Sequence, residues 1–211
     1  AGNLESFRHE STGMSYSDIQ VIIHDGKPFR NYLLDDWVEQ FDHVVRLSEL
    51  CDTFPDLVAV GRNKSIEWFL NRTNLNQVLL LDDDMVPNKY TLPIFSSEAD
   101  IVGSNYLDHE GRRYHRAEDQ AACGCLLIKR EVLEAMKSPW FKFDIAEEGL
   151  NTNRCECRFF CEKASVLGFT IEKTGIVGHI ATVVIRPPVN GEGVSMQYWN
   201  TLIKNRANTK Y

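Results

Sequence analysis

The chain has 211 residues, enough to bury one hydrophobic core, and its 43% hydrophobic and 25% charged content is typical of a globular domain. Its formal net charge of −7 argues against proteins that bind nucleic acid by neutralising phosphates along a groove, so no nucleic-acid partner is expected. No apolar run is long enough to span a bilayer, and the N-terminus lacks an apolar signal region. We therefore expect no transmembrane segment and a cytoplasmic location.

The first half of the chain alternates between strand and helix patterns after a polar N-terminal arm at residues 1–17. The expected strands are residues 19–23, 55–60 and 78–81, and the expected helices are residues 31–51 and 65–70, with a turn at 61–63. The helix at 31–51 is indicated by apolar residues that recur at helical spacing.

The second half continues the alternation around a polar loop at residues 107–120. The expected helices are residues 92–97, 130–136 and 159–167, and the expected strands are residues 99–106, 121–128, 169–171 and 175–180. Gly168 is expected to end the last helix. This order predicts an α/β sandwich with a mostly parallel central sheet over residues 18–185. The tail, residues 186–211, is interpreted as a lid or a docking helix.

In the segment QVLLLDDDMVP (77–87), a short apolar run typical of a buried strand is followed directly by three adjacent carboxylates. Pro87 prevents the strand from extending further. Ligands of open α/β sheets bind beyond the carboxyl ends of the strands, which is where these carboxylates lie. Oxygen ligands suit Mg²⁺ and Mn²⁺, so the segment predicts a divalent cation site. The alternative is an acidic turn that caps the next helix.

The six cysteines fall into two clusters and one isolated residue, Cys51. The clusters are Cys123 with Cys125, and Cys155 with Cys157 and Cys161. Buried, reduced thiols are the favoured interpretation, because neither cluster has the two-residue gap typical of zinc sites, and in a strand the first pair would share one face without converging. A thiolate zinc site is the alternative.

Six blocks of the chain, in a consistent order, resemble the GT-A-fold glycosyltransferases, including family-2-like members, which use nucleotide-sugar donors. The blocks are GRNKSIEWFL (61–70), VLLLDDDMVP (78–87), EADIVGSNY (98–106), CGCLLIKREVLEAM (123–136), CECRFFCEKASVLGF (155–169) and VGHI (177–180). The second block resembles the Asp-x-Asp segment of that family. The resemblance implies a Rossmann-like α/β/α sandwich and transfer of a sugar from a UDP- or GDP-linked donor to a hydroxyl of a glycan, lipid or protein.

By the same resemblance, Asp84, Asp82 and His179 would hold Mn²⁺ or Mg²⁺. The implied nucleotide-binding residues are Arg62, Asp82, Asp83 and Asp25. The alternative for Arg62 is a helix cap or an ion pair with Asp25, and the alternative for His179 is a core histidine bonded to a backbone carbonyl. The loop at 107–120 is expected to contact the sugar or the acceptor.

The expected catalytic base is Glu156, which matches the first acid of the family's Glu-Asp pair. Cys157 occupies the second position, and a neutral thiol is a poor substitute for a carboxylate base. The base could therefore be Glu156, or Glu147, Glu148 or Asp144 on the preceding loop. Retention of configuration without such a base, or lost activity, is also compatible with the sequence.

Two other functions compete with this one. LLLDDDMV also fits the first motif of haloacid-dehalogenase-like phosphatases, in which Asp82 would be the nucleophile and Asp84 the general acid with Mg²⁺. That fold usually opens with this strand, whereas about eighty residues precede it here. The other is a non-catalytic binding module held together by zinc through the cysteine clusters.

Overall fold

The structure is a computed structural model of the chain, and it describes residues 16–25, 31–50, 58–106, 120–145 and 152–180. The chain divides into two compact units, residues 1–181 and 182–211, and all described residues belong to the first. The C-terminal tail, most of the N-terminal arm, most of the loop at 107–120, Cys51, Glu147 and Glu148 lie outside the described residues.

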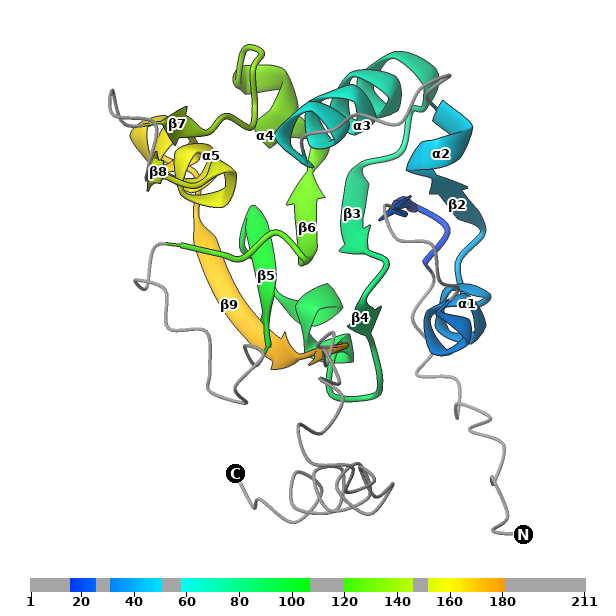
Figure 1. Cartoon of the computed structure of the whole chain (residues 1–211). Coiled ribbons are helices and arrows are strands. Elements are labelled where there is room, and N and C mark those ends of the chain that lie inside the picture. Colours follow the sequence, from blue (N-terminus) through cyan, green and yellow to red (C-terminus); the bar gives the residue numbers. More distant parts are fainter. Residues whose placement is uncertain (1–15, 26–30, 51–57, 107–119, 146–151, 181–211) are drawn as a thin grey trace, which may run out of the picture. The chain divides into compact units, whose positions relative to one another are not determined.

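A six-stranded sheet forms the centre of the first unit (Figure 1). In spatial order its strands are β2 (His43–Arg46), β1 (Ile19–His24), β3 (Gln77–Asp82), β6 (Cys125–Lys129), β5 (Ile101–Asn105) and β9 (Ile171–Ile176). Only β6 runs against its neighbours, since β1 pairs in parallel with β2 and β3, and β5 pairs in parallel with β9. The predicted mostly parallel sheet is confirmed.

Helices and two short ribbons complete the unit. The helices are α1 (Tyr32–Val38), α2 (Leu47–Leu50), α3 (Val58–Arg72), the 3-10 helix η1 (Leu92–Ser96), α4 (Arg130–Ala135) and α5 (Glu156–Val166). The two-stranded ribbons are β4 (Met85–Val86) with β10 (Gly178–His179), and β7 (Asp144–Ile145) with β8 (Thr152–Arg154). Among the described helices, none has the length and apolar character needed to cross a membrane.

The sheet is buried on both faces, which makes the unit an α/β/α sandwich. On one face, Val78 and Leu80 of β3 join a core cluster with residues of α3, α4 and α5. On the other face, Leu79 and Leu81 join a cluster with residues of α1 and η1. Because successive strand residues point to opposite faces, an unbroken apolar run is what a strand covered on both sides requires. All four of these side chains have zero exposed surface.

Two predictions in the first half are wrong. Residues 43–46, inside the predicted helix 31–51, form strand β2, where Val44 and Val45 pair with β1. Residues 58–60, inside the predicted strand 55–60, begin α3, and the predicted turn at 61–63 lies within that helix. Asn63 is accommodated there by tertiary bonds, because its side chain donates to Phe141 O (2.7 Å) and accepts from the same residue's N–H (3.0 Å).

Candidate active site

The site begins where β1 and β3 end side by side. Their parallel register sets His24 directly opposite Asp82. The His24 Nδ1 atom lies 3.5 Å from Asp82 Oδ1, and the backbone N–H of Asp83 donates to the His24 carbonyl (3.3 Å). The sequence interpretation ended the first strand at residue 23 and missed His24 as a site residue. The signal was available, because residues that follow neighbouring parallel strands emerge at the same edge.

Arg62 connects this edge to the start of α5. Its Nη2 atom donates to both oxygens of Asp82 (2.8 and 2.9 Å), and its Nη1 atom donates to Glu156 Oε1 (2.9 Å). Only 3% of the Arg62 side chain is exposed. A buried guanidinium requires compensation of its charge, and these two carboxylates provide it. Arg62 therefore acts from the interior of α3 as a bridge between β3 and α5.

The bridge fixes the charges of the residues around it. Burial opposes ionisation of Asp82, but the nearby Arg62 and the hydrogen bond with His24 outweigh it, so the pKa of Asp82 lies below its ordinary value. Burial lowers the pKa of His24 more than its bond to Asp82 raises it. At neutral pH the pair therefore consists of a carboxylate and an uncharged imidazole.

Asp84 and His179 meet on the ribbon formed by β4 and β10. His179 pairs with Met85 in antiparallel register, and the backbone N–H of Ile180 donates to the Asp84 carbonyl (2.8 Å). This brings His179 Nε2 within 3.3 Å of Asp84 Oδ2. The Tyr106 ring packs beside the imidazole, with 5.6 Å between ring centroids.

The Asp84–His179 pair fits a divalent cation, because an oxygen and a neutral imidazole nitrogen are suitable ligands for Mn²⁺ or Mg²⁺. Asp82 fits less well, since both of its oxygens accept from Arg62. Within the part of the chain that the structure describes, Asp82, Asp84 and His179 do not form a group whose ligand atoms all lie within 4.8 Å of one another. The geometry brings two of the three predicted metal ligands together.

Asn31 holds the loop that carries the carboxylates. Its Nδ2 atom donates to the carbonyls of Asp83 (3.0 Å) and Met85 (2.7 Å), while its Oδ1 atom accepts from Leu34 N–H as the N-cap of α1. Asp83 is itself buried. The sequence interpretation missed Asn31, although an Asn before an apolar helix pattern is an N-cap signal.

Asp25 lies next to His24 but does not pair with Arg62. Its carboxylate accepts from the backbone N–H (2.9 Å) and hydroxyl (2.5 Å) of Ser48 in α2. Asp25 directly follows the end of β1. Its role in nucleotide binding remains a prediction.

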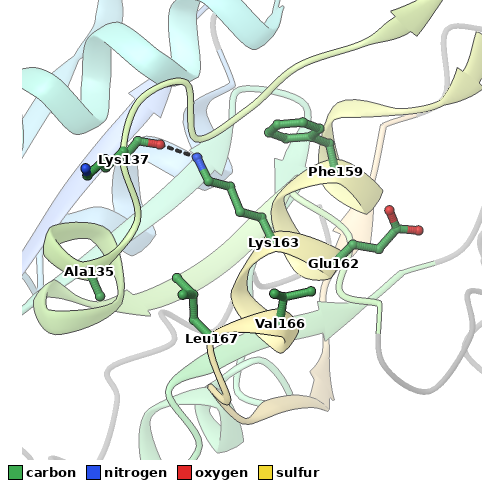
Figure 2. Close-up of a pocket in the computed structure, with 7 residues that line it drawn as sticks. All are labelled: Ala135, Lys137, Phe159, Glu162, Lys163, Val166 and Leu167. Atoms are coloured by element: carbon green, nitrogen blue, oxygen red, sulfur yellow. Dashed lines mark hydrogen bonds between the residues drawn. The ribbon is translucent and has the colours of Figure 1, made fainter.

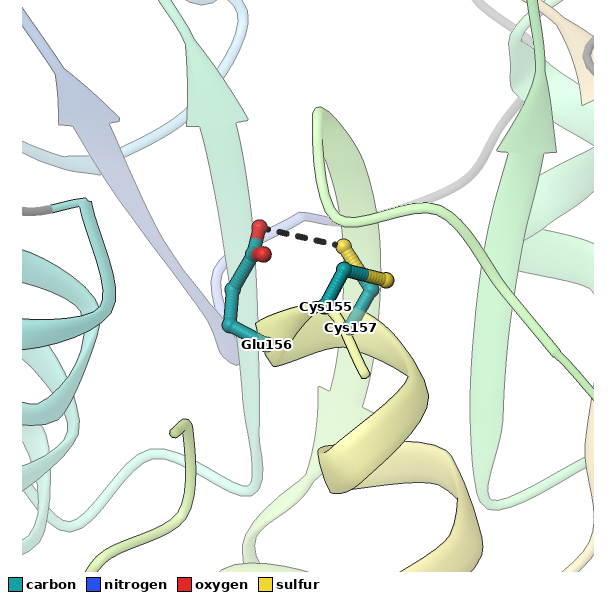
Figure 3. Close-up of side chains that lie close together, drawn as sticks. All are labelled: Cys155, Glu156 and Cys157. Carbon is teal, nitrogen blue, oxygen red and sulfur yellow. Dashed lines mark hydrogen bonds between the residues drawn. The ribbon is translucent and has the colours of Figure 1, made fainter. Parts of the chain in front are cut away.

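Glu156 occupies the first turn of α5 with its carboxylate turned toward the Cys157 sulfur (Figure 3). Glu156 Oε1 accepts from Arg62 and from the Cys157 thiol (3.2 Å). No described residue donates a hydrogen bond to the second oxygen, Oε2. Hydrogen bonding with the Cys123 thiol raises the pKa of Cys157 well above its ordinary value, so without a bound metal ion this thiol is protonated. Cys157 is therefore a donor to Glu156 and not a replacement base.

Among the cavities in the described part of the chain, two of the larger ones lie apart from these charges. One, of about 490 Å³, is lined by Leu33 and Trp37 of α1 and by the stretch from Val86 to Tyr90, which continues from Asp84 and Met85. The other, of about 610 Å³, lies between α4 and α5, where Lys163 reaches over to the Lys137 carbonyl (Figure 2). None of the predicted site residues lines the second cavity.

Comparison with known proteins identifies the fold. No protein-family model and no curated protein sequence matches the chain. A197 from STIV is similar in structure, with a TM-score of 0.57 and 20% identity over 77% of this chain and 85% of that one. The predicted GT-A-like fold is confirmed.

Two further solved structures are similar at lower scores. One is the inositol-1-phosphate CTP transferase from T. maritima, with a TM-score of 0.48 and 10% identity over 93% of this chain and 99% of that one. The other is glucosyl-3-phosphoglycerate synthase from Mycobacterium tuberculosis in complex with Mn²⁺, UDP-glucose and phosphoglyceric acid, with a TM-score of 0.43 and 14% identity over 79% of this chain and 73% of that one.

Proposed function

We propose that the chain is a metal-dependent glycosyltransferase that moves a sugar from a nucleotide-diphosphate sugar to a hydroxyl acceptor. The observation that carries this proposal is the arrangement at the carboxyl edge of β3. There Asp84, paired with His179 in an arrangement suited to a cation, follows Asp82 of the Asp82–Arg62–Glu156 bridge by two residues. The GT-A-like fold supports it, because ligands of open α/β sheets bind at this edge.

In this proposal Asp84 and His179 would hold the Mn²⁺ or Mg²⁺ ion. The bound cation supplies charge that offsets the negative charge of the departing nucleotide. Asp82 keeps a quarter of its side chain exposed while Arg62 fixes its orientation. Each carboxylate oxygen has a second lone pair, so Asp82 can still accept a hydrogen bond from a ribose hydroxyl. Asp83 supports the loop from its buried position.

Glu156 is the proposed base of an inverting transfer. Arg62 and Cys157 hold its Oε1 atom, which leaves Oε2 to accept the proton of the acceptor hydroxyl. Asp144, Glu147 and Glu148 are the alternatives that the sequence offers. Glu156→Gln distinguishes catalysis from donor binding. It should abolish sugar transfer and leave metal-dependent nucleotide binding unchanged.

Calorimetric titration tests the donor site. UDP, GDP and their sugar conjugates are titrated into the protein with and without Mn²⁺, and one nucleotide is expected to bind only in the presence of metal. Asp84→Asn and His179→Gln should each weaken that binding by at least about tenfold, because each removes one of two protein ligands.

Asp42→Asn and His43→Gln are matched controls. Both side chains are exposed, and His43 begins β2, at the end of the parallel strands opposite to Asp82. These variants should bind like the parent. Nucleotide binding that is equally tight without metal, or that survives unchanged in Asp84→Asn, would show that the assignment of the cation site is wrong.

A further inference from the structure

Thiols from two distant segments gather at the N-terminus of α5. The Sγ atoms of Cys155 and Cys157 and a carboxylate oxygen of Glu156 all lie within 4.8 Å of one another (Figure 3). Cys123, which precedes β6, lies close enough to Cys157 to raise the pKa of that thiol, although its sulfur is outside the group within 4.8 Å. Cys155 is the N-cap of α5, and its side chain makes no capping bond. Two thiols and the proposed base thus form a compact cluster, with a third thiol next to it.

We propose that Cys123, Cys155, Cys157 and Glu156 form a binding site for Zn²⁺, distinct from the cation site at Asp84 and His179. Thiolate sulfur favours Zn²⁺, whereas Mg²⁺ and Mn²⁺ prefer oxygen ligands, so the two sites select different metals. Sulfurs bound to one tetrahedral zinc lie about 3.8 Å apart. The ligand atoms of Cys155, Cys157 and Glu156 already lie within 4.8 Å of one another, so side-chain adjustments of about 1 Å suffice to bring these three to one ion, and Cys123 completes the set.

Positive charge lies beside the cluster, and a bound ion would have to displace the thiol protons. Zn²⁺ displaces three thiol protons to solvent, and the three thiolates with the ion carry one net negative charge. The Arg62 guanidinium donates to Glu156 Oε1 (2.9 Å), which places one positive charge next to the cluster. The N-terminus of α5 adds a partial positive charge on the same side.

Glu156 is placed to serve as the fourth ligand. Its Oε1 atom is occupied by Arg62, and Oε2 receives no hydrogen bond from a described residue, so Oε2 is the ligand atom. A ligating carboxylate whose other oxygen is held by a donor is a common second-shell arrangement. Cys155 is half-buried, whereas Cys123 and Cys157 are buried, so the ion enters past Cys155.

Zinc bound at this site would prevent Glu156 from acting as the base, a consequence that rests on the proposed function. With Oε2 bound to zinc, Glu156 no longer accepts the acceptor proton. Zinc and transfer therefore exclude each other at one carboxylate, although the nucleotide and its cation bind elsewhere. One equivalent of Zn²⁺ should stop transfer, and a chelator should restore it.

Cobalt substitution tests the site without an activity assay. The protein is reduced, stripped of metal with a chelator and titrated with Co²⁺, whose bonds to thiolate give strong charge-transfer absorption. One equivalent should develop this absorption, and one equivalent of Zn²⁺ should remove it. Cys155→Ala and Cys157→Ala should each weaken the absorption and lower the metal affinity at least about tenfold, because each removes a ligand.

Cys125→Ala is the matched control, because Cys125 is fully buried on the opposite face of the sheet and should keep the full absorption. Should Cys157→Ala fail to fold, the half-buried Cys155 still provides the test. Absence of the absorption, or full absorption in Cys155→Ala, would overturn the site. Asp84→Asn should retain the cobalt spectrum, so loss of the donor site and loss of the thiolate site are distinguishable. Transfer that continues at full rate with zinc bound would refute the role of Glu156 as fourth ligand.

Discussion

At the scale of single residues, Arg62 has the largest structural role in the site. One guanidinium neutralises both Asp82 on β3 and Glu156 on α5. The two carboxylates come from different elements, so Arg62 links those elements. Its raised pKa, to which Asp82 is the leading favourable contributor against the cost of burial, keeps the charge in place at all ordinary pH values. Loss of that charge would leave two neighbouring carboxylates to repel each other.

Arg62→Met is therefore expected to destabilise the fold by about 3–5 kcal/mol, the usual cost of removing one partner from a buried ion pair. Urea unfolding monitored by circular dichroism measures the change. The stability of Arg62→Lys should fall between those of the parent and Arg62→Met, because lysine keeps the charge but not the planar fork that contacts both carboxylates.

Arg158→Met is the control for a surface ion pair. Half of the Arg158 side chain is exposed, and its partner Glu162 lies one turn along the same helix. Its loss should cost less than about 1 kcal/mol. A similar small cost for Arg62→Met would mean that the two carboxylates do not depend on the buried guanidinium.

At the scale of secondary structure, Asp100 fastens three strands at one end of the sheet. Its Oδ2 atom accepts from the Thr170 N–H (2.9 Å) and hydroxyl (2.8 Å) before β9, and its Oδ1 atom accepts from Lys129 Nζ (3.0 Å) at the end of β6. The backbone bond from Thr170 is the leading cause that lowers the pKa of Asp100. The carboxylate form is thus the one that the fold stabilises.

The stability contributed by Asp100 should be lost in acid. Because its pKa is lower in the folded chain than in the unfolded chain, the contribution is complete above the unfolded pKa and disappears as pH falls through the folded value. At pH 7, Asp100→Asn should be less stable than the parent by about 1–2 kcal/mol, through weaker hydrogen bonds. Urea unfolding at pH 7, 4 and 3 should show the free energies of unfolding of the parent and Asp100→Asn converge as the pH falls. A difference in stability that stays constant or widens in acid would contradict this origin.

Strand and helix prediction succeeded where the local pattern and the tertiary environment agreed. The strand ending at Asp82 and the helix ended by Gly168, which has a φ of +86°, were both predicted and are present. Residues 43–46 were predicted to be helical, because their apolar spacing continues that of α1. Pairing of Val44 and Val45 with β1 decides otherwise, and no local pattern reports a partner strand.

At the scale of the whole molecule, the order of strands in the sheet argues against the phosphatase alternative. In that class the carboxylate-bearing strand usually opens the fold, whereas here β1 and β2 precede β3 in the chain and lie to one side of it in the sheet. Asp82, the nucleophile of that alternative, has both oxygens engaged by Arg62. A carboxylate so held is poorly available for attack on phosphorus.

We therefore expect no Mg²⁺-dependent phosphate release from simple phosphomonoesters. A colorimetric phosphate assay with and without Mg²⁺ measures it, and the Asp82→Asn variant provides the control for contaminating activity. Mg²⁺-dependent release that disappears in Asp82→Asn would favour the phosphatase over the transferase.

The sequence by itself determined the local features of the site. An apolar run that ends in three carboxylates specifies a doubly covered strand with charge at its end, because side-chain alternation and the exclusion of unpaired charge from a core act over a few residues. The alternation of strands and helices likewise determined the α/β class.

Only the tertiary structure decided which groups meet. His179 is 95 residues from Asp84, and Glu156 is 94 residues from Arg62, yet each pair is in direct contact. The sequence also placed Cys123 and Cys125 on one face, whereas the structure assigns them to the cores on opposite faces, since Gly124 lies in a turn before β6. Contacts of this kind depend on strand order and register, which arise from packing of the whole chain and leave no trace in the spacing of neighbouring residues.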